Sequence, residues 1–322
     1  MNRPRIFWVV LALCFAMPVA AQTWPLKPVT IVVGLPPGGG ADTVARFVAE
    51  QLRERTGQQF LVENRPGAFS AVGTQFVARA APDGYTLLVS TVSAAMNVSL
   101  FKKLPYDHIR DFTPVTTLST APWLLVVSPQ EVPVNSVAEL TKYISARPDK
   151  IAWGGPGSGG TVAAELYFSL AGLRREQLTF IPYKGGPDTL QDLLGGRIQF
   201  TFFEATFGTQ QARGGKVRAL AVTSPTRISA ASDIPTMAES GFPTFDVVGW
   251  YAMFLPAKAP KQIAQKLAEL CNASMTTEKA REFLRKLAME PKPLSPEDFA
   301  QFLGDETEKW GRLIKNARIE QQ

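Results

Sequence analysis

The chain has 322 residues, of which 45% are hydrophobic and 19% are charged, and its formal net charge is +6. This composition is typical of a globular protein, excludes a disordered or fibrous chain, and allows one large core or two moderate ones. The basic residues are spread along the chain without an interleaved aromatic cluster, so we expect no nucleic-acid partner. A small anionic ligand suits this charge better.

The first 21 residues differ from the rest of the chain. Arg3 and Arg5 precede the apolar run "IFWVVLALCFAM", and "VAA" at 19–21 offers small residues for cleavage. We therefore predict a secretory signal peptide over residues 1–21. The alternative, an uncleaved anchor, is disfavoured because the apolar run is shorter than the roughly 20 residues of a spanning helix. Cleavage removes two basic residues and lowers the net charge to +4; it also removes Cys14, which leaves Cys271 alone and excludes an intrachain disulfide.

Strand-like and helix-like segments then alternate, which predicts βαβ units around parallel sheets. The first series is a strand at 29–34, a helix at 43–55, a strand at 59–64, a helix at 70–80 and a strand at 85–91. The second series comprises helices at 136–146, 161–172, 188–196 and about 207–215, with strands at 150–154, 178–183, 198–204 and 217–224. Two series predict two sheets.

Two long β-prone segments connect the series. We interpret 111–129 and 245–257 as strands that cross between two α/β domains, with helices at 261–273, 277–287 and 296–317 packing back onto the first domain. The predicted first domain is discontinuous and covers 22–125 and 250–322, and the second covers 126–249.

The segment "LPPGGGAD" separates the first strand from the first helix. Gly38, Gly39 and Gly40 would let an anion approach the unpaired N–H groups at the helix N-terminus, and Asp42 is a reasonable N-cap. A tight turn without a ligand is the alternative interpretation. A P-loop is disfavoured because no Gly-Lys-Ser/Thr follows.

A second glycine-rich turn, "WGGPGSGGT", again lies between a strand and a helix. Gly155, Gly157 and Gly160 satisfy the dinucleotide-binding spacing, but the following strand ends without the acidic residue that would hold a ribose. Ser158 and Thr161 place hydroxyls beside free amides, which suits a carboxylate, although a simple helix cap explains them equally well. Because ligands bind outside the carboxyl ends of strands in open α/β sheets, both loops should face one cleft.

Other polar residues at strand ends should line this cleft. The strand at 85–91 gives Ser90, Thr91 and Ser93, with Asn97 opening the next helix, and the strand at 198–204 ends at Glu204, which we interpret as a ligand contact or hinge residue. Candidates for catalysis are few. The single histidine, His108, is expected to be solvent-exposed, Ser158 lacks a nucleophile elbow, and one histidine with one mature cysteine cannot build the usual metal sites.

Several segments in their order along the chain resemble the Bug-type extracytoplasmic solute receptors of tripartite tricarboxylate transporters. They include "IVVGLPPGGGAD", "VENRPGA", "ARAAPDGYTLL", "IPYKGG", "DLLGGRI" and "IPTMAESGFP". The resemblance implies a type II-like periplasmic binding protein fold, with two α/β domains joined by crossing hinge strands around a ligand cleft. It also implies a periplasmic, monomeric receptor that has no enzymatic activity and no cofactor.

The resemblance further implies the ligand and its contacts. The expected ligand is a small organic anion, namely a dicarboxylate, an amino acid or an aromatic carboxylate, delivered to membrane permease subunits. The implied ligand-binding residues are Leu35, Pro37, Gly38, Gly39, Gly40, Asp42, Ser90, Thr91, Ser93, Asn97, Gly155, Gly157, Ser158, Gly159, Thr161 and Glu204. The family commonly has Pro-Phe where this chain has Gly34 and Leu35. A sensor that passes its closed form to a signalling partner is one alternative, and a dinucleotide-dependent enzyme is another.

Overall fold

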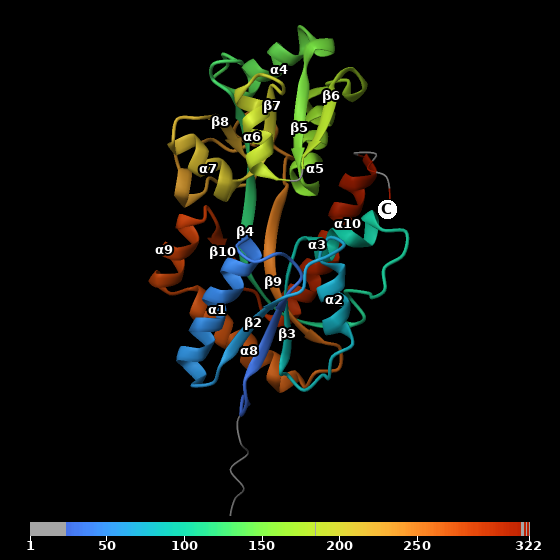
Figure 1. The fold of residues 1–322 in the computed structure, drawn as a ribbon, viewed down its shortest axis with the longest axis vertical. Helices are drawn as coiled ribbons and strands as arrows, with labels where there is room; N and C mark the ends of the chain where they lie inside the picture. The colour runs from blue at the N-terminus through green and yellow to red at the C-terminus, as the bar shows by residue number, and fades with distance from the viewer. Residues whose placement is uncertain (1–23, 184, 317–318, 320, 322) are drawn as a thin grey trace, which may run out of the picture.

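The structure, a computed structural model, describes residues 24–183, 185–316, 319 and 321. The predicted signal peptide lies outside these residues. Figure 1 shows an elongated molecule in which two α/β halves are stacked along the long axis, with strands β4 and β9 running between them. Among the described residues, no helix is long and apolar enough to cross a membrane.

The lower half in Figure 1 contains most of the N-terminal third of the chain together with its C-terminal helices. Its elements are β1 (Val29–Val33), α1 (Gly40–Thr56), β2 (Phe60–Asn64), α2 (Ala71–Ala78), β3 (Thr86–Thr91), α3 (Ser93–Leu100), β9 (Val248–Pro256), α8 (Lys261–Met275), α9 (Glu278–Lys286), β10 (Glu290–Pro291) and α10 (Pro296–Asn316). The predicted alternation is confirmed here, and β10 is a strand that the sequence did not predict.

The upper half contains the second predicted series. Its elements are α4 (Val137–Ser145), β5 (Ala152–Pro156), α5 (Ser158–Ala171), β6 (Thr179–Tyr183), α6 (Gly186–Leu194), β7 (Phe200–Glu204), α7 (Ala205–Arg213) and β8 (Arg218–Val222), with short 3₁₀ turns at Pro148–Lys150, Arg175–Gln177 and Ser229–Ala231. The long strand β4 (Phe112–Val127) precedes them. Helices α1 and α5 each begin three residues earlier than predicted, inside the glycine runs.

The prediction of two sheets was wrong, because β4 pairs with strands of both halves and joins the described strands into one 10-stranded sheet. The strand order is β2-β1-β3-β9-β4-β7-β5-β6, with β10 and β8 also paired to β4. The first part of β4, up to Pro122, pairs antiparallel with β9, and its last part, from Trp123, pairs with β7 and β8. β1, β2 and β3 are parallel to one another, as are β5, β6 and β7. The domain boundaries at 125/126 and 249/250 stay a prediction.

Alternate residues of β1 face different helices, as the two-residue period of a strand requires. Ile31 and Val33 belong to the buried cluster that includes residues of α1 and α8, whereas Val32 belongs to the cluster that includes residues of α2, α3 and α10. Since both faces are covered, the strand reads as a continuous apolar run.

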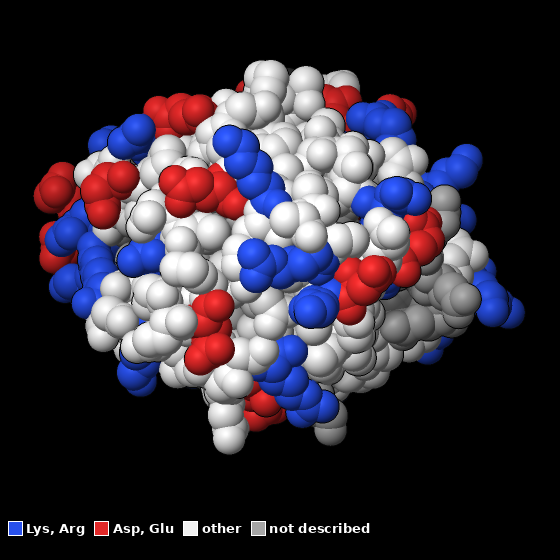
Figure 2. Space-filling view, turned by 90° about the horizontal axis from the view of Figure 1, so that it is seen from above, with Lys and Arg blue, Asp and Glu red and all other residues white. Residues whose placement is uncertain are grey.

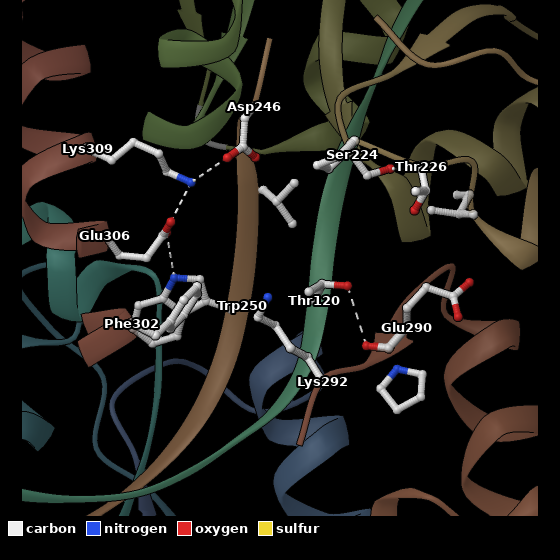
Figure 3. A pocket seen from close by; sticks show the side chains of 14 residues that line it. Thr120, Ser224, Thr226, Asp246, Trp250, Glu290, Lys292, Phe302, Glu306 and Lys309 are labelled. Atoms are coloured by element: carbon white, nitrogen blue, oxygen red, sulfur yellow. Dashed lines mark hydrogen bonds and ion pairs between the residues drawn. The ribbon is translucent and has the colours of Figure 1, made fainter. Parts of the chain in front are cut away.

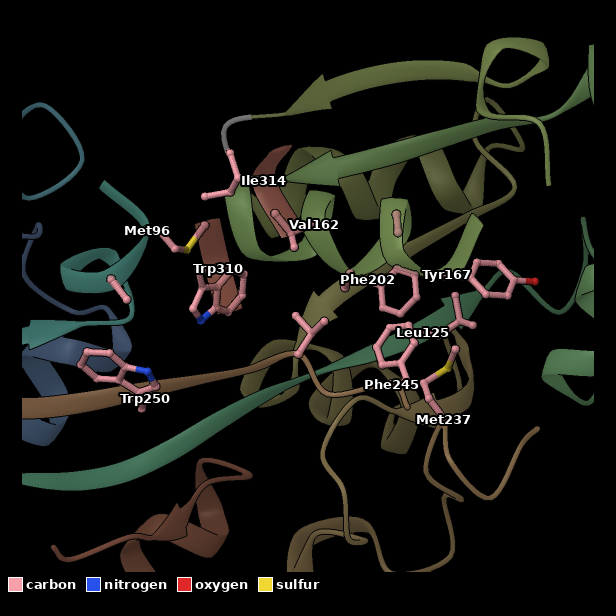
Figure 4. Packing of buried hydrophobic residues seen from close by; sticks show 14 of the residues in the cluster. Met96, Leu125, Val162, Tyr167, Phe202, Met237, Phe245, Trp250, Trp310 and Ile314 are labelled. Atoms are coloured by element: carbon pink, nitrogen blue, oxygen red, sulfur yellow. The ribbon is translucent and has the colours of Figure 1, made fainter. Parts of the chain in front are cut away.

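The apolar core on the α10 side continues from one half into the other (Figure 4). Trp250 of β9 and Trp310 of α10 belong to the same buried cluster as Tyr167 and Phe202 of the upper half. Helix α10 packs against α3 and β4, as expected for the C-terminal helices, and it also contacts α5. The two halves therefore share a packed seam along α10.

Charged residues do not gather by sign on the end of the molecule that Figure 2 shows. Lysine and arginine side chains alternate there with aspartate and glutamate. This distribution agrees with the dispersed charge of the sequence.

Candidate functional site

The loop after β1 presents unpaired amides at the start of α1. Gly39 is the N-cap and makes no side-chain cap, and the first helical hydrogen bond runs from Thr43 N to Gly39 O. The N–H groups of Gly40, Ala41 and Asp42 precede that bond, so they are the donors that an anion could use. Gly38 has φ +84°, which explains the need for glycine in this turn.

Asp42 is not the N-cap that the sequence predicted. It lies in the first turn of α1, where its carboxylate accepts the Gly38 N–H at 2.9 Å and pairs with Arg46 at 2.9 Å. Burial alone would raise the pKa of Asp42, but the hydrogen bonds from Arg46 and the Gly38 N–H outweigh it and lower that pKa. Asp42 is therefore ionised and paired, and it fixes the shape of the loop.

The loop after β5 repeats this arrangement in the upper half. Gly157, with φ +88°, is the N-cap of α5, and Ser158 is the first helical residue rather than a cap. The Thr161 hydroxyl donates to Gly157 O at 3.0 Å, so it does not cap an N–H group either. The amides of Ser158, Gly159 and Gly160 precede the first helical bond, from Thr161 N to Gly157 O. They form a second set of free donors at the carboxyl end of a strand.

Glu204 and Tyr251 connect the two halves between these loops. Glu204 ends β7 and is partly buried, and the hydroxyl of Tyr251 on β9 donates to its Oε1 at 2.9 Å. A Cβ on Gly40 would overlap the same hydroxyl. The start of α1, the middle of β9 and the end of β7 therefore meet at Tyr251.

Trp123 brings the second loop to the same region. It is the cross-strand partner of Glu204, and a Cβ on Gly159 would overlap its ring. Thr91 is the cross-strand partner of Tyr251, and its Oγ1 contacts the hydroxyl of Ser93 at 3.0 Å. The structure thus brings Gly40, Thr91, Gly159 and Glu204 together around two aromatic side chains.

Two of the predicted residues are buried. Ser90 and Asn97 are each 1% exposed. Asn97 does not open a helix, because α3 begins at Ser93; its Nδ2 donates instead to Phe69 O at 3.0 Å. Asn97 thereby fastens the loop before α2. The ligand contacts assigned to Leu35, Pro37, Gly155 and the other predicted residues stay a prediction.

The expected exposure of His108 was wrong. His108 is 2% exposed and lies among the rings of Tyr106, Phe112 and Phe254. Burial lowers its pKa from 6.5 to about 3. The mostly polar segment around this histidine, "PYDHIRDF", gave no sign that its ring would complete an aromatic cluster.

Tyr251 and Trp123 are the site residues that sequence reasoning missed. Both stand in apolar strands, where an aromatic residue is ordinarily part of a core. The glycines opposite them, Gly40 and Gly159, are the available signal, since each marks a close approach of backbone to a ring.

A separate cavity lies on the other face of the β4–β9 ribbon (Figure 3). Trp250 and Tyr251 are successive residues of a strand, so their side chains point to opposite faces. The cavity has a volume of about 350 Å³, and its lining includes Trp250, Lys309 and Asp246. Lys309 pairs with Asp246 at 3.2 Å and also with Glu306, whose Oε2 accepts the Trp250 Nε1–H. No predicted ligand-binding residue lines this cavity, and the described residues hold no cluster of three or more potential metal ligands.

Comparison with known proteins identifies the family. The tripartite tricarboxylate transporter family receptor model matches residues 44–319. The chain belongs to this family of solute-binding receptors. The predicted periplasmic binding protein fold is confirmed, and a dinucleotide-dependent enzyme is excluded, because the family consists of receptors rather than enzymes.

Three solved structures resemble this receptor closely. An R. palustris protein determined with adipate is 32% identical, with a TM-score of 0.82, and covers 93% of this chain and 100% of its own. The periplasmic binding protein BugD is 33% identical, with a TM-score of 0.77 and coverages of 93% and 100%. MatC from Rhodopseudomonas palustris, with bound malate, is 31% identical, with a TM-score of 0.75 and coverages of 90% and 100%.

Proposed function

We propose that this receptor captures a small organic carboxylate between its two halves, in the periplasm, for a tripartite transporter. The observation that carries the proposal is the pair of helix N-termini of α1 and α5, one in each half. Both helices begin in a glycine run, and neither has a side-chain cap. Unpaired amides and the positive end of the helix dipole suit a carboxylate. The relatives determined with adipate and malate support the same ligand class.

Each half supplies donors, so closure of the halves would enclose the ligand and exclude water. The ligand shifts the population toward the closed form only by its differential affinity for that form. Trp123 and Tyr251 supply aromatic surface beside the amides, which suits a ligand with a hydrocarbon body as well as a carboxylate.

The predicted signal peptide supports delivery to the periplasm, and family membership supports membrane permease subunits as the partner. A sensor remains the second candidate. Genes for permease subunits beside that of the receptor would favour transport, whereas a two-component sensor gene would favour signalling.

Calorimetry of the signal-free protein with a panel of carboxylates that includes adipate and malate tests the proposal. We expect at least one to bind, and we expect Gly39→Val to abolish that binding without unfolding the protein. Gly39 has φ −80°, and its Cβ would meet no atom closer than 3.8 Å, so the new side chain blocks the amides rather than straining the backbone.

Gly214→Val is the matched control, because Gly214 also has an ordinary φ of −74° but ends α7. Gly157 is unsuitable, since any side chain at φ +88° strains the turn. Wild-type affinity in Gly39→Val, or no binding of any carboxylate to the unaltered protein, would contradict the proposal.

A further inference from the structure

Tyr251 connects the anion-binding end of α1 to the carboxyl group of the opposite half. Its hydroxyl donates to Glu204 Oε1 at 2.9 Å and lies against the backbone of Gly40. We infer that Tyr251 is a positioning residue that fixes Glu204 beside the start of α1, so that carboxylate binding is coupled to protonation of Glu204. The inference rests on the proposed function and adds to it a proton that is taken up with the ligand.

The Tyr251 ring is held from several sides. It is 6% exposed, and its residue pairs with Thr91 of β3 and with Ser119 of β4 in the sheet. A Cβ on Gly40 would overlap the hydroxyl and would lie 3.2 Å from Met289 Cε. The first residue of α1 can therefore approach the hydroxyl only because it is glycine. A ligand carboxylate on the amides of Gly40 and Ala41 would lie close to this hydrogen bond.

No basic side chain is paired with Glu204 among the residues that the structure describes. On the neighbouring elements, Trp123 of β4 lies opposite it and Asp42 of α1 is paired with Arg46. Glu290 of β10 accepts the Ser229 N–H at 2.7 Å and lines the cavity on the other face of the ribbon. Since no described basic side chain is paired with it, an ionised Glu204 would repel a carboxylate ligand.

The consequence is a pH-dependent affinity. Burial raises the pKa of Glu204, and the hydrogen bond from Tyr251 partly opposes that rise. A ligand anion stabilises the protonated form further, so binding takes up a proton where free Glu204 is ionised. As pH rises through the pKa of free Glu204, the affinity for an anion should fall, by at most about tenfold per pH unit for one coupled proton.

Tyr251→Phe removes the hydroxyl and keeps the ring. Without the opposing hydrogen bond, the pKa of Glu204 rises, so the fall in affinity should begin at a higher pH than in the unaltered protein. Each protein has a pH at which half of this fall in affinity has occurred, which we call its midpoint. At pH values between the two midpoints, Tyr251→Phe should bind the dicarboxylate more tightly than the unaltered protein, although it has lost a hydrogen bond. Glu204→Gln should bind with an affinity that does not change over this pH range and should take up no proton.

The measurement is calorimetry with adipate and with malate from about pH 5 to pH 8, in two buffers of different ionisation enthalpy, which counts the protons taken up. Tyr167→Phe is the matched control, because Tyr167 is also buried and its hydroxyl contacts Thr141 at 2.8 Å, whereas the hydrogen bond to Glu204 comes from Tyr251. The control should keep the pH profile of the unaltered protein.

Three results separate the possible failures. If the unaltered protein binds no carboxylate, the proposed function fails and takes this inference with it. If it binds with an affinity independent of pH, or if Glu204→Gln keeps the pH dependence, the inference alone is overturned. If Tyr251→Phe folds and its midpoint equals that of the unaltered protein, Tyr251 has no positioning role; if Tyr251→Phe does not fold, Glu204→Gln decides the outcome.

Discussion

At the scale of single residues, the two acids near the start of α1 are held in opposite ways. Asp42 is paired with Arg46 and accepts the Gly38 N–H, which lowers its pKa, whereas burial raises the pKa of Glu204. Asp42 shapes the loop, and its pairing with Arg46 weakens its repulsion of an anion. Glu204 has no such partner among the described residues, so an anion nearby favours its protonation. Two carboxyl groups in one site thus take different roles because their surroundings differ.

The residue types in the sequence predicted the glycine loops well, but they predicted the contacts between side chains poorly. Gly38, Gly39 and Gly40 were predicted to bind an anion because a glycine run between a strand and a helix exposes backbone amides. Glu204 was predicted as a ligand contact or hinge residue because a carboxylate ending an apolar strand is unusual. Gly40 signals the close approach of another group but does not show that this group is Tyr251, because the contact joins β9 to α1, two elements far apart in the sequence.

The buried ring of His108 predicts how the free energy of unfolding depends on pH. Because burial lowers its pKa from 6.5 to about 3, the unfolded chain binds a proton more readily than the folded one below pH 6.5. Folding stability from this group is complete above pH 6.5 and is lost as pH falls toward 3, by about 1.4 kcal/mol per pH unit.

His108→Leu should remove this loss. We expect the difference in unfolding free energy between about pH 7.5 and pH 4.5 to shrink by about 2–3 kcal/mol, measured by urea denaturation. An equal difference in both proteins would show that His108 is protonated without unfolding its aromatic surroundings.

At the scale of elements, the early starts of α1 and α5 are the main departure from the predicted boundaries. Glycine has a low helix propensity, so the sequence placed both starts after the glycine runs. The structure extends each helix back into its run, because the backbone must come close to Tyr251 in one case and to Trp123 in the other. Tertiary packing here overrides local preference, and it does so at the two ends proposed to bind the ligand.

The sheet shows the same limit on prediction. Apolar β-prone segments predicted β4 and β9, and the alternation of elements predicted two α/β series. That β4 serves both parts of the sheet could not be predicted, since 16 residues of similar β propensity do not reveal where one set of partners ends. β10 is too short, at two residues, to leave a pattern.

Two glycine variants test the packing at the element scale. Gly159→Ala should destabilise the protein by about 1–3 kcal/mol, because its Cβ would overlap the Trp123 ring. Gly304→Ala, inside α10, meets no atom within 4 Å and should stabilise the protein by about 0.5–1 kcal/mol.

Urea denaturation of both variants measures the two shifts. Equal stability of Gly159→Ala and the unaltered protein would show that α5 does not need this close approach to β4. A loss of stability in Gly304→Ala would show that α10 is restrained at this turn by something other than its own helix propensity.

At the scale of the whole molecule, contacts between the halves lie on both faces of the β4–β9 ribbon. Tyr251 and Glu204 meet on one face, and Lys309 pairs with Asp246 on the other (Figure 3). Rotation about the ribbon would narrow one face while it opened the other. The apolar seam through Trp310 runs beside the second face (Figure 4), so it constrains how far the halves can separate there.

The central claim is that both glycine-rich helix N-termini bind one carboxylate ligand. A crystal structure of the signal-free protein with the tightest-binding carboxylate of the panel tests it most directly. We predict carboxylate oxygens within hydrogen-bond distance of amides at the starts of both α1 and α5, with Glu204 and Tyr251 beside the ligand. A ligand in the cavity lined by Trp250 and Lys309, or one bound to neither helix N-terminus, would contradict the claim.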